Sequence, residues 1–379
     1  MSAARRPVVA VDLLYFTGKR GGTETYAREL LPRVAALLPE VELVALTNTT
    51  ADVAVTRWFP GRTRRLPVDG ENRVLWAAAE TFLVERSARR TGADLLWCPA
   101  NFGPRSVRLP TVVSVHDVIA EDFPNPDVSR VTQAVTSRII RRAARSARLL
   151  VTVSQDSARS ITRVLGVPPD RIRVAPNGFG APQPVGDPGA ELAGLGVPEG
   201  RPLVLSTGNR MPHKNFATLL RAVARIPAER RPLLVITGSH GQDPLVPLVD
   251  ELDLVDDVLL LGWITRPQLE ALFGAATVYV CPSLVEGFGL PVVDAMARGC
   301  AVLCSDVGAL REVGGDAVRY YGPARDDARL AQELGALLSS ADERDELVRR
   351  GAERAATFSW DRAAAVLADA WAEVLGLPR

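Results

Sequence analysis

The stretch of residues 277–312 constrains the fold more than any other part of this chain. It opens on a short apolar run, 277–281, which is rich in β-branched and aromatic residues and is followed by proline. Such a run predicts a buried strand. The pair Leu290-Pro291 then predicts the start of a helix, because proline in the first helical turn loses no hydrogen bond. With a second apolar run at 300–305, the stretch predicts a strand–loop–helix–strand unit.

The start of this helix is a candidate phosphate site. If the helix begins near Leu290, the backbone N–H groups of Phe288, Gly289 and Leu290 point out of its N-terminus. A helix N-terminus attracts anions, phosphate above all, because its free N–H groups carry a partial positive charge. Glycine at this place lets a ligand approach the backbone closely.

Two acidic residues frame the same turn. Glu286 lies in the loop before the helix, and Asp294 lies eight residues later, about one helical turn in. An ionised carboxylate accepts hydrogen bonds from two hydroxyls of a sugar or a ribose at once. For Asp294 the alternative is compensation of the helix dipole, which an acid in the first turn often provides.

The run Glu-Gly-Phe-Gly-Leu-Pro that begins at Glu286, with Asp294 behind it, resembles the retaining glycosyltransferases of the GT-B fold in family 4, which carry a Glu-x7-Glu motif. The resemblance implies that Glu286 contacts the transferred sugar and that the second acid holds the nucleotide ribose. The amides of residues 288–290 are expected at the diphosphate or the sugar. Because Asp294 is shorter than glutamate by one C–C bond, about 1.5 Å, we expect an altered ribose geometry rather than another reaction.

A second candidate site follows the predicted strand 202–207, where the sequence places Arg210 and Lys214. Two fixed cations suit a pyrophosphate leaving group, because negative charge grows on it as the bond to the sugar breaks. The resemblance implies that this pair grips the donor diphosphate. It also implies that Gly238 lies near the nucleotide and that Trp263 packs on the base, with a core aromatic as the alternative for Trp263.

The first half of the chain supplies two further candidates. Gly22 belongs to a Gly-Gly-x-Glu run after the first predicted strand, and the resemblance places it against the donor. The dinucleotide fingerprint G-x-G-x-x-G is absent there, which argues against a Rossmann dehydrogenase. His116 stands where the predicted strand 111–116 runs out into a loop, the position that ligands occupy in open α/β sheets. A lone histidine is more often structural, but the resemblance implies that His116 contacts the sugar or the acceptor.

Strands alternate with helices along the whole chain, and 379 residues exceed one ordinary domain. The sequence therefore predicts an α/β protein of the GT-B class, with two doubly wound, Rossmann-like parallel sheets facing a cleft. We expect an acceptor-binding domain at 1–181 and a nucleotide-sugar-binding domain at 182–357, with a glycine- and proline-rich linker at 182–200. The last helix, 358–379, is expected to cross back to the first domain.

The net charge of +1 hides an asymmetry between the two halves. Residues 1–181 hold 26 Lys+Arg against 17 Asp+Glu, or +9, which leaves 19 against 27, or −8, for the remainder. A basic half points to an anionic partner such as a membrane surface or a pyrophosphate-bearing acceptor, with solvated arginines as the alternative. Within it, residues 128–148 predict an arginine-rich helix. Its apolar residues are expected to pack on the sheet, and a membrane surface is the alternative partner.

The cysteine pattern gives no metal site. The four cysteines show no zinc-type spacing with the three histidines, so we expect reduced thiols in the cytoplasm. A convincing Asp-x-Asp between strands is missing, and we expect neither a metal nor a cofactor apart from the nucleotide-sugar co-substrate. No run of about 18 apolar residues is present, so the expected location is the cytoplasm or the inner face of the membrane.

Together these features predict a metal-independent retaining glycosyltransferase, of the hexosyltransferase kind. It would move a sugar from a UDP- or GDP-sugar to a hydroxyl acceptor, such as a lipid-linked glycan, a polysaccharide precursor or a natural product. Nucleic acid is not an expected partner. Two alternatives remain open: a catalytically silent subunit that binds a nucleotide sugar, which Asp294 suggests, and a sugar-nucleotide epimerase, which changes the donor without an acceptor.

Overall fold

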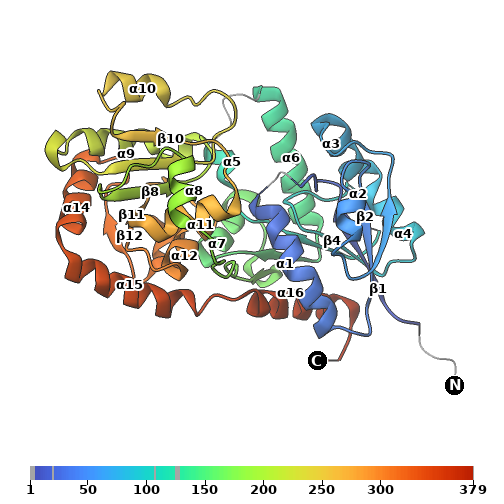
Figure 1. The fold of residues 1–379 in the computed structure, drawn as a ribbon. Helices are drawn as coiled ribbons and strands as arrows, with labels where there is room; N and C mark the ends of the chain where they lie inside the picture. The colour runs from blue at the N-terminus through green and yellow to red at the C-terminus, as the bar shows by residue number, and fades with distance from the viewer. Residues whose placement is uncertain (1–4, 19–20, 106–107, 124–128, 379) are drawn as a thin grey trace. The chain divides into compact units, whose positions relative to one another are not determined.

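The computed structural model describes residues 5–18, 21–105, 108–123 and 129–378. The chain divides into two compact units: unit 1 comprises Met1–Gly178 with Ser359–Arg379, and unit 2 comprises Phe179–Phe358. Each unit contains one parallel sheet with helices packed on it (Figure 1). The prediction of two doubly wound parallel sheets is thereby confirmed.

Unit 1 contains a seven-stranded sheet in the order β3-β2-β1-β4-β5-β6-β7, and all of its neighbouring strands are parallel. Most of these strands are short buried apolar runs, as the sequence predicts. The exception is the edge strand β3, whose sequence RTRR has no apolar pattern and reads as a loop. It forms because its backbone pairs with β2. The strands are β1 (Val8–Leu13), β2 (Glu42–Thr47), β3 (Arg62–Arg65), β4 (Leu95–Cys98), β5 (Thr111–Ser114), β6 (Leu149–Thr152) and β7 (Ile172–Val174).

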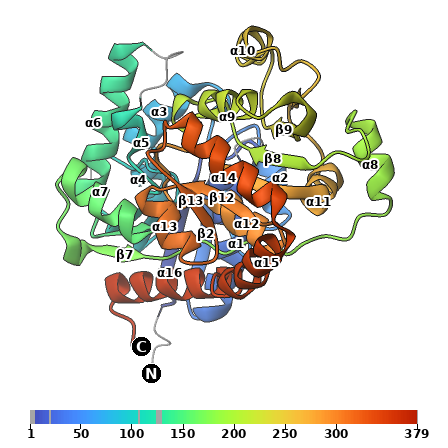
Figure 2. The same ribbon diagram turned by 90° about the vertical axis from the view of Figure 1, so that its left-hand side faces the viewer.

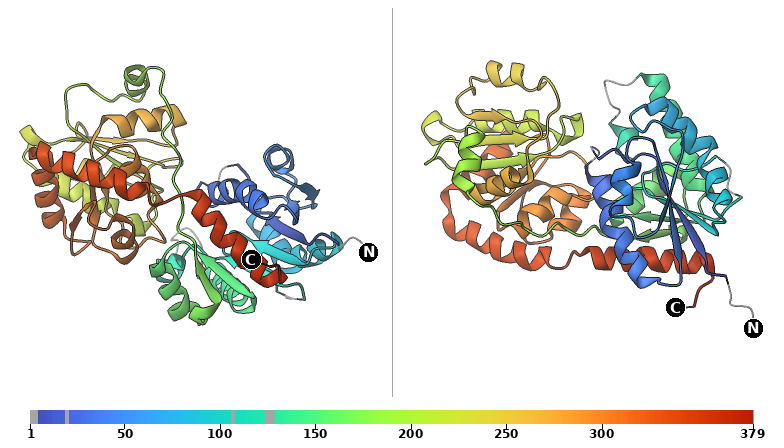
Figure 3. Two further views of the ribbon diagram at one scale, coloured as in Figure 1. Left: turned by 90° about the horizontal axis from the view of Figure 1, so that it is seen from below. Right: turned by 45° about the vertical axis from the view of Figure 1, so that its right-hand side comes forward.

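The helices of unit 1 include the last helix of the chain, α16, which packs against α1 and the first sheet (Figure 3). Arg33 on α1 donates its Nε to Asp361 on α16 at 2.9 Å. The Ser359 hydroxyl caps α16 by accepting from the Arg362 amide at 3.2 Å. The helices are α1 (Gly22–Leu37), α2 (Asp52–Thr56), α3 (Arg73–Phe82), α4 (Val84–Arg90), α5 (Ile119–Asp122), α6 (Arg130–Ser146), α7 (Gln155–Leu165), the 3-10 turn η1 (Pro169–Arg171) and α16 (Trp360–Leu375).

Helix α6 differs from its sequence prediction. Its apolar residues have helical spacing and are expected to pack on the sheet, but Val131 is 74% exposed and Val135 is 52% exposed. Only Ala143 and Ala144 of this helix are buried. The prediction is therefore wrong for the N-terminal half of α6, because the helix reaches the sheet only near its C-terminal end.

Unit 2 contains a six-stranded parallel sheet in the order β10-β9-β8-β11-β12-β13. The predicted strand at 277–281 is the central strand β11, and the predicted strand at 300–305 becomes its neighbour β12. Between them lies helix α12, which begins at Leu290 as the sequence predicts. The strands are β8 (Leu203–Thr207), β9 (Leu233–Thr237), β10 (Val258–Leu260), β11 (Ala276–Cys281), β12 (Val302–Ser305) and β13 (Arg319–Tyr321).

The helices of unit 2 lie on both faces of this sheet, with α9 and α14 together and α12 beside α15 (Figure 2). A short helix, α8, occupies part of the expected linker: the Asp187 carboxylate caps it by accepting from the Ala190 amide at 3.0 Å. The helices and 3-10 turns are α8 (Pro188–Gly194), η2 (Pro212–Lys214), α9 (Phe216–Ala224), η3 (Ala228–Arg230), α10 (Val246–Glu251), α11 (Arg266–Ala275), α12 (Leu290–Ala297), α13 (Gly308–Gly314), α14 (Asp327–Ser339) and α15 (Ala341–Ala355).

The strand orders place one topological switch point in each sheet. In unit 1 the order reverses between β1 and β4, and in unit 2 it reverses between β8 and β11. Ligands of open α/β sheets bind beyond the carboxyl ends of the strands at such a point, because the two adjacent loops diverge there. The fold therefore favours a ligand site of unit 2 in the loops after β8 and β11.

Replacing Trp371 by alanine is expected to lower the free energy of unfolding by about 3–5 kcal/mol. Trp371 on α16 is fully buried, and its ring centroid lies 5.5 Å from that of Trp97 on β4. Urea denaturation followed by circular dichroism measures the change. Asp369→Ala, at an exposed position of the same helix, is the control and should stay within about 0.5 kcal/mol of the parent. An equally small loss for Trp371→Ala would contradict the packing of α16 on this sheet.

Candidate functional site

Two loops at the carboxyl edge of the second sheet are joined by backbone and side-chain hydrogen bonds. One loop follows β8 and contains η2; the other follows β11 and leads into α12. The Leu284 amide donates to the His213 carbonyl at 2.7 Å, and the Asn215 side-chain amide donates to the Pro282 carbonyl at 2.9 Å. Because these loops flank the switch point, they bring residues about 70 positions apart into one site.

The centre of this site is an ion pair. Lys214 Nζ lies 2.6 Å from Glu286 Oε1, and the Ser283 hydroxyl donates to the same oxygen at 2.6 Å. The side chains of Lys214 and Glu286 are only 15% and 9% exposed. No hydrogen bond to Glu286 Oε2 is found within the described ranges. The pair therefore leaves one carboxylate oxygen able to accept from a hydroxyl.

Glu286 is ionised at neutral pH. Burial alone raises the pKa of this carboxyl group, but the charge of Lys214 and the hydrogen bonds from Lys214 and Ser283 outweigh burial. The pKa of Glu286 therefore lies below its ordinary value. Deprotonated Glu286 is an acceptor only, so its carboxylate is suited to hydrogen bonds from hydroxyl donors.

The N-terminus of α12 lies directly after this carboxylate. Gly289 caps the helix with φ of 99°, a left-handed conformation that favours glycine, and an added Cβ would lie 2.6 Å from Leu310 Cδ2. In the part of the chain that is described, no acceptor is found for the amides of Phe288, Gly289 or Leu290. The Phe288 ring is itself buried against Phe358, with 5.5 Å between the centroids. The Phe288 side chain is therefore turned into the protein, and only its backbone amide is left to bind a ligand.

Asp294 is held by Arg298, the residue that caps the C-terminal end of α12. Arg298 donates to Asp294 Oδ1 at 2.9 Å and to both oxygens of Glu270 at 2.7 and 2.8 Å. Burial raises the pKa of Asp294 and outweighs the opposing charge of Arg298. The Asp294 side chain is 28% exposed, so it remains accessible while Arg298 fixes its orientation.

Arg210 points into the protein rather than toward Lys214. Its Nε donates to Asp243 at 2.9 Å, and its two amino groups donate to the carbonyls of Gly208 and Ile236 at 2.9 and 3.1 Å. The guanidinium side chain is 6% exposed. These contacts fix the turn after β8. A phosphate contact by Arg210 would require this arrangement to change.

Gly238 and Trp263 lie on the neighbouring loops of the same edge. Gly238 has φ of 107°, and a Cβ there would lie 2.8 Å from the Gly208 carbonyl oxygen, so the packing of the two turns already requires glycine. Trp263 is 59% exposed and stacks on His240, with 5.2 Å between centroids and 25° between planes. Trp263 is therefore not a core aromatic, and the stacked pair offers a flat surface.

In unit 1, His116 lies at the carboxyl end of β5. Its Nε2 is 2.8 Å from the Pro99 carbonyl oxygen, which requires a proton on Nε2, and its amide donates to Asn101 Oδ1 at 2.8 Å. Burial lowers the pKa of His116 and outweighs the opposing effects of the Pro99 hydrogen bond and Asp117. In the neutral ring Nδ1 therefore carries the lone pair and accepts hydrogen bonds.

Helix α1 connects Gly22 to the surroundings of His116. Tyr26, one turn after Gly22, packs edge-on against His116 with 4.7 Å between ring centroids. A Cβ added to Gly22 would meet no atom of the described residues within 4 Å. The described residues therefore do not require glycine at this position, whereas the close approach of a ligand would. Lys19, the other lysine of the chain, lies outside the described residues.

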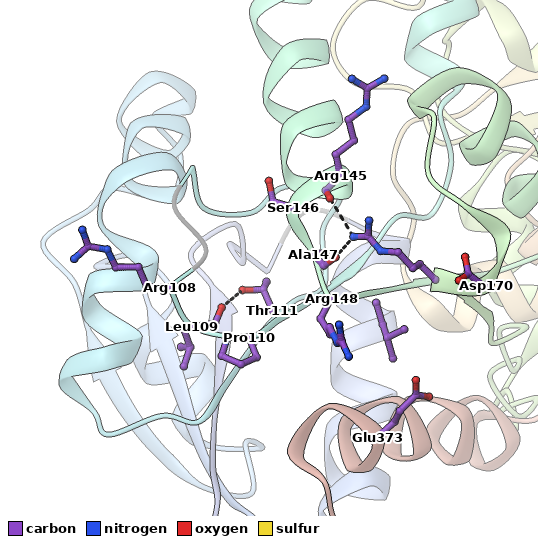
Figure 4. A pocket seen from close by; sticks show the side chains of 12 residues that line it. Arg108, Leu109, Pro110, Thr111, Arg145, Ser146, Ala147, Arg148, Asp170 and Glu373 are labelled. Atoms are coloured by element: carbon purple, nitrogen blue, oxygen red, sulfur yellow. Dashed lines mark hydrogen bonds between the residues drawn. The ribbon is translucent and has the colours of Figure 1, made fainter.

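A hollow of about 680 Å³ lies at the opposite, amino edge of the first sheet (Figure 4). Four arginines are among its lining residues, but the Arg108 and Arg145 guanidinium groups point away from the other side chains drawn. Arg171 donates to the carbonyls of Arg145 and Ala147. The arginines therefore do not converge on one ligand position.

Metal-binding clusters and membrane-spanning helices are absent from the described residues. No three His, Cys, Asp or Glu side chains gather there in a way that would hold a metal ion. Within the same ranges, no helix has both the length and the apolar character that a bilayer crossing needs. The four cysteines are buried free thiols.

Three residues that contribute hydrogen bonds to the site are not identifiable from the sequence. Ser283 and Asn215 are polar residues in loops, and Asp243 lies 33 positions from the arginine that it binds. The residues next to them in the sequence do not indicate which groups they bind. The only sequence signal is their place beside strands that border the switch point of the sheet.

Two protein-family descriptions match the chain. Glycosyltransferase Family 4 matches residues 20–180, and Glycosyl transferases group 1 matches residues 190–354. The two matches fall on the first and the second unit in turn. They agree with the resemblance carried by Glu286 and the motif around it.

Curated relatives are glycosyltransferases by name. An "MMP alpha-(1->4)-mannosyltransferase" of Mycolicibacterium hassiacum is 35% identical over 230 residues, which cover 59% of this chain and 54% of the relative. A "D-inositol 3-phosphate glycosyltransferase" of Nocardia farcinica is 31% identical over 287 residues, 71% of this chain and 62% of the relative. The match thus spans less than two thirds of either relative. A protein of the latter name from Mycolicibacterium paratuberculosis is 29% identical over 379 residues, 91% of this chain and 84% of the relative.

Solved structures share the fold at low sequence identity. Sucrose-phosphate synthase from Thermosynechococcus elongatus superposes with a TM-score of 0.74 at 21% identity, covering 98% of this chain and all of the other. WaaG, a glycosyltransferase involved in lipopolysaccharide biosynthesis, gives a TM-score of 0.71 at 18% identity, with 96% and 99% covered. The family matches on both units and this shared fold lead to one conclusion: the chain belongs to the GT-B glycosyltransferases of family 4, the group 1 glycosyltransferases.

Proposed function

We propose that this protein transfers a sugar from a nucleotide diphosphate donor to a hydroxyl acceptor, with retention of configuration at the anomeric carbon and without a metal ion. The observation that carries the proposal is the Lys214–Glu286 pair beside the unbonded amides of α12, at the switch point of the second sheet. This arrangement combines a cation and backbone donors for phosphate with a carboxylate for hydroxyls.

Each group has a distinct part in the proposed reaction. The amides of residues 288–290 and the Lys214 ammonium stabilise the charge that develops on the departing diphosphate. Glu286 orients the sugar by accepting from its hydroxyls through Oε2, while Lys214 and Ser283 hold Oε1. Asp294 contacts the ribose, and the Trp263–His240 stack supports the base.

The residues proposed to contact the acceptor belong to unit 1. Neutral His116 accepts a hydrogen bond from a sugar or acceptor hydroxyl through Nδ1, and Gly22 gives the donor room at the start of α1. No enzyme nucleophile is needed, because in a front-face reaction the departing phosphate oxygen takes the acceptor's proton. The excess of basic residues in this half and the inositol phosphate in the name of two relatives favour an anionic acceptor.

Arg210 has a supporting part in this proposal. Its side chain binds Asp243 and the Gly208 carbonyl, so it holds the turn that precedes η2 and Lys214. We therefore expect the Arg210 cation to act on the diphosphate mainly through the position of this turn. The nucleotide base stays open between UDP and GDP; UDP is tested first because the structure of Anabaena HepE was solved with UDP-glucose.

One nucleoside diphosphate is expected to raise the melting temperature of the protein, since a ligand that binds only the folded state stabilises it. A thermal-shift panel of UDP, GDP, dTDP, ADP and CDP identifies which one. Lys214→Gln should abolish the shift relative to its own ligand-free melting temperature. Arg221→Gln, an exposed arginine on α9, is the matched control and should keep it. No shift with any diphosphate at millimolar concentration would overturn the donor site.

Sugar transfer is expected to survive chelation, because protein donors take the place of a metal ion at the diphosphate. The measurement is product formation from the nucleotide sugar identified by the panel, in the presence and absence of EDTA, across hydroxyl acceptors. Glu286→Gln should lower turnover by about 10²-fold or more, because it removes the charge that orients the sugar. Activity that EDTA removes and a divalent ion restores would contradict metal independence.

The protein is expected to lose stability as the pH falls below about 6.5 in a way that depends on His116. The pKa of this imidazole is lowered in the folded state, so the unfolded chain takes up the proton first. The stability that neutral His116 contributes is thus present above the unfolded pKa and is lost as the pH falls through the folded pKa. Urea denaturation of the parent and His116→Gln at pH 7.5, 6.5 and 5.5 measures this. Parallel pH dependences would show that His116 is not the group responsible.

A further inference from the structure

Exposed apolar side chains gather on two helices of unit 1. Ten large apolar side chains are strongly exposed among the residues described, and five of them lie on α3, at the junction of α3 with α4, or on α6. We call this the α3–α6 surface. Its exposed apolar members are Leu75, Phe82, Leu83, Val131 and Val135.

Helices α3 and α6 lie side by side in Figures 1 and 2. The loop before β5 joins them: the Arg105 amide donates to the Thr81 carbonyl at 3.1 Å, and Arg142 Nε donates to the Arg105 carbonyl at 3.0 Å. A hollow of about 310 Å³ lies between them. Phe82 and Val135 line it together with the three arginines 105, 138 and 142.

The charge of this surface is predominantly positive, and the acid found against α6 is Glu121, whose carboxylate lies 4.0 Å from an amino group of Arg141. Helix α6 carries five arginines and no acidic residue, and the hollow is lined by three arginines and no carboxylate. The one acid of α3, Glu80, is buried and accepts from the Trp76 indole at 2.8 Å. In the described structure no partner is found for the guanidinium groups of Arg105 and Arg138. These two cations are thus available to an external anion.

The order of residues along α6 matches a membrane-facing helix. Val131, Val135, Arg138 and Arg142 follow one another at helical spacing and lie along one face. None of the first thirteen residues of α6 is buried. Apolar side chains flanked by arginines suit a bilayer interface, because valine and phenylalanine enter the acyl boundary while arginine reaches the lipid phosphates.

We propose that the α3–α6 surface docks the protein onto a bilayer that contains anionic lipid. The apolar residues supply the insertion, and Arg105, Arg138 and the other arginines of α6 supply the attraction to phosphate headgroups. Charge complementarity selects this partner over a second copy of the chain, since two copies would bring like charges together. The proposal stands apart from the donor site, because none of its residues lies in unit 2.

Vesicle sedimentation tests the proposal. At low salt the protein should pellet with vesicles of phosphatidylcholine and phosphatidylglycerol but not with phosphatidylcholine alone, and rising salt should release it. The double variant Arg105→Gln/Arg138→Gln should weaken partition about thirtyfold, since each basic residue near such a surface contributes about 1 kcal/mol. The double variant Val131→Ser/Val135→Ser should weaken it about tenfold through lost apolar burial.

Matched controls lie in unit 2. Val255→Ser, at a site that is 64% exposed, and Arg221→Gln should bind vesicles like the parent. Circular dichroism and the nucleotide thermal shift check that each variant folds, which separates this proposal from the donor site. The proposal is overturned if the parent does not pellet at low salt, or if the variants of the α3–α6 surface bind as well as the controls. It is equally overturned if light scattering shows that the Val131 and Val135 substitutions abolish a dimer instead.

Discussion

The buried ion pair of Lys214 and Glu286 is the constraint around which the candidate site is built. Neither charge is tolerable alone in this position, because removing a charge from water costs several kcal/mol unless a partner and further hydrogen bonds compensate. Ser283 provides one such bond, and the Ser305 hydroxyl in turn binds the Ser283 carbonyl. Buried pairs of this kind add little net stability. Their presence at a switch point therefore favours function over stability as the reason for the pair.

The hydrogen-bond partners of Asp294, the second acid of the motif, explain its orientation better than the length of its side chain does. Arg298 bonds to both Asp294 and Glu270, so a buried carboxylate on α11 fixes the arginine that fixes the aspartate. Asp294 has fewer rotatable bonds than glutamate, and Arg298 restricts it further. A short but pre-oriented carboxylate loses less conformational entropy on binding a hydroxyl than a long free one does.

The sequence predicts the parallel sheets and the start of α12 because local patterns determine them: apolar runs, a proline and a positive-φ glycine. It does not predict where a side chain finds its partner. For example, nothing in the sequence around Arg210 indicates that Asp243, 33 residues away, binds its side chain. The sequence does not predict edge strand β3 either, because this strand forms through backbone pairing with β2 and has no apolar pattern.

Helix α6 shows why periodicity alone is ambiguous. An apolar stripe on a helix predicts that the stripe is buried in a contact. It does not tell whether the contact is with the protein's own sheet or with an external partner. The exposure of Val131 and Val135 excludes the first choice for the N-terminal half of the helix. The exposed arginines of α6 can be hydrated by water, so their charge alone does not require a binding partner. Exposed valines that share a helix face with Arg138, whose guanidinium has no partner in the described structure, do favour one, and an anionic bilayer accommodates both at once.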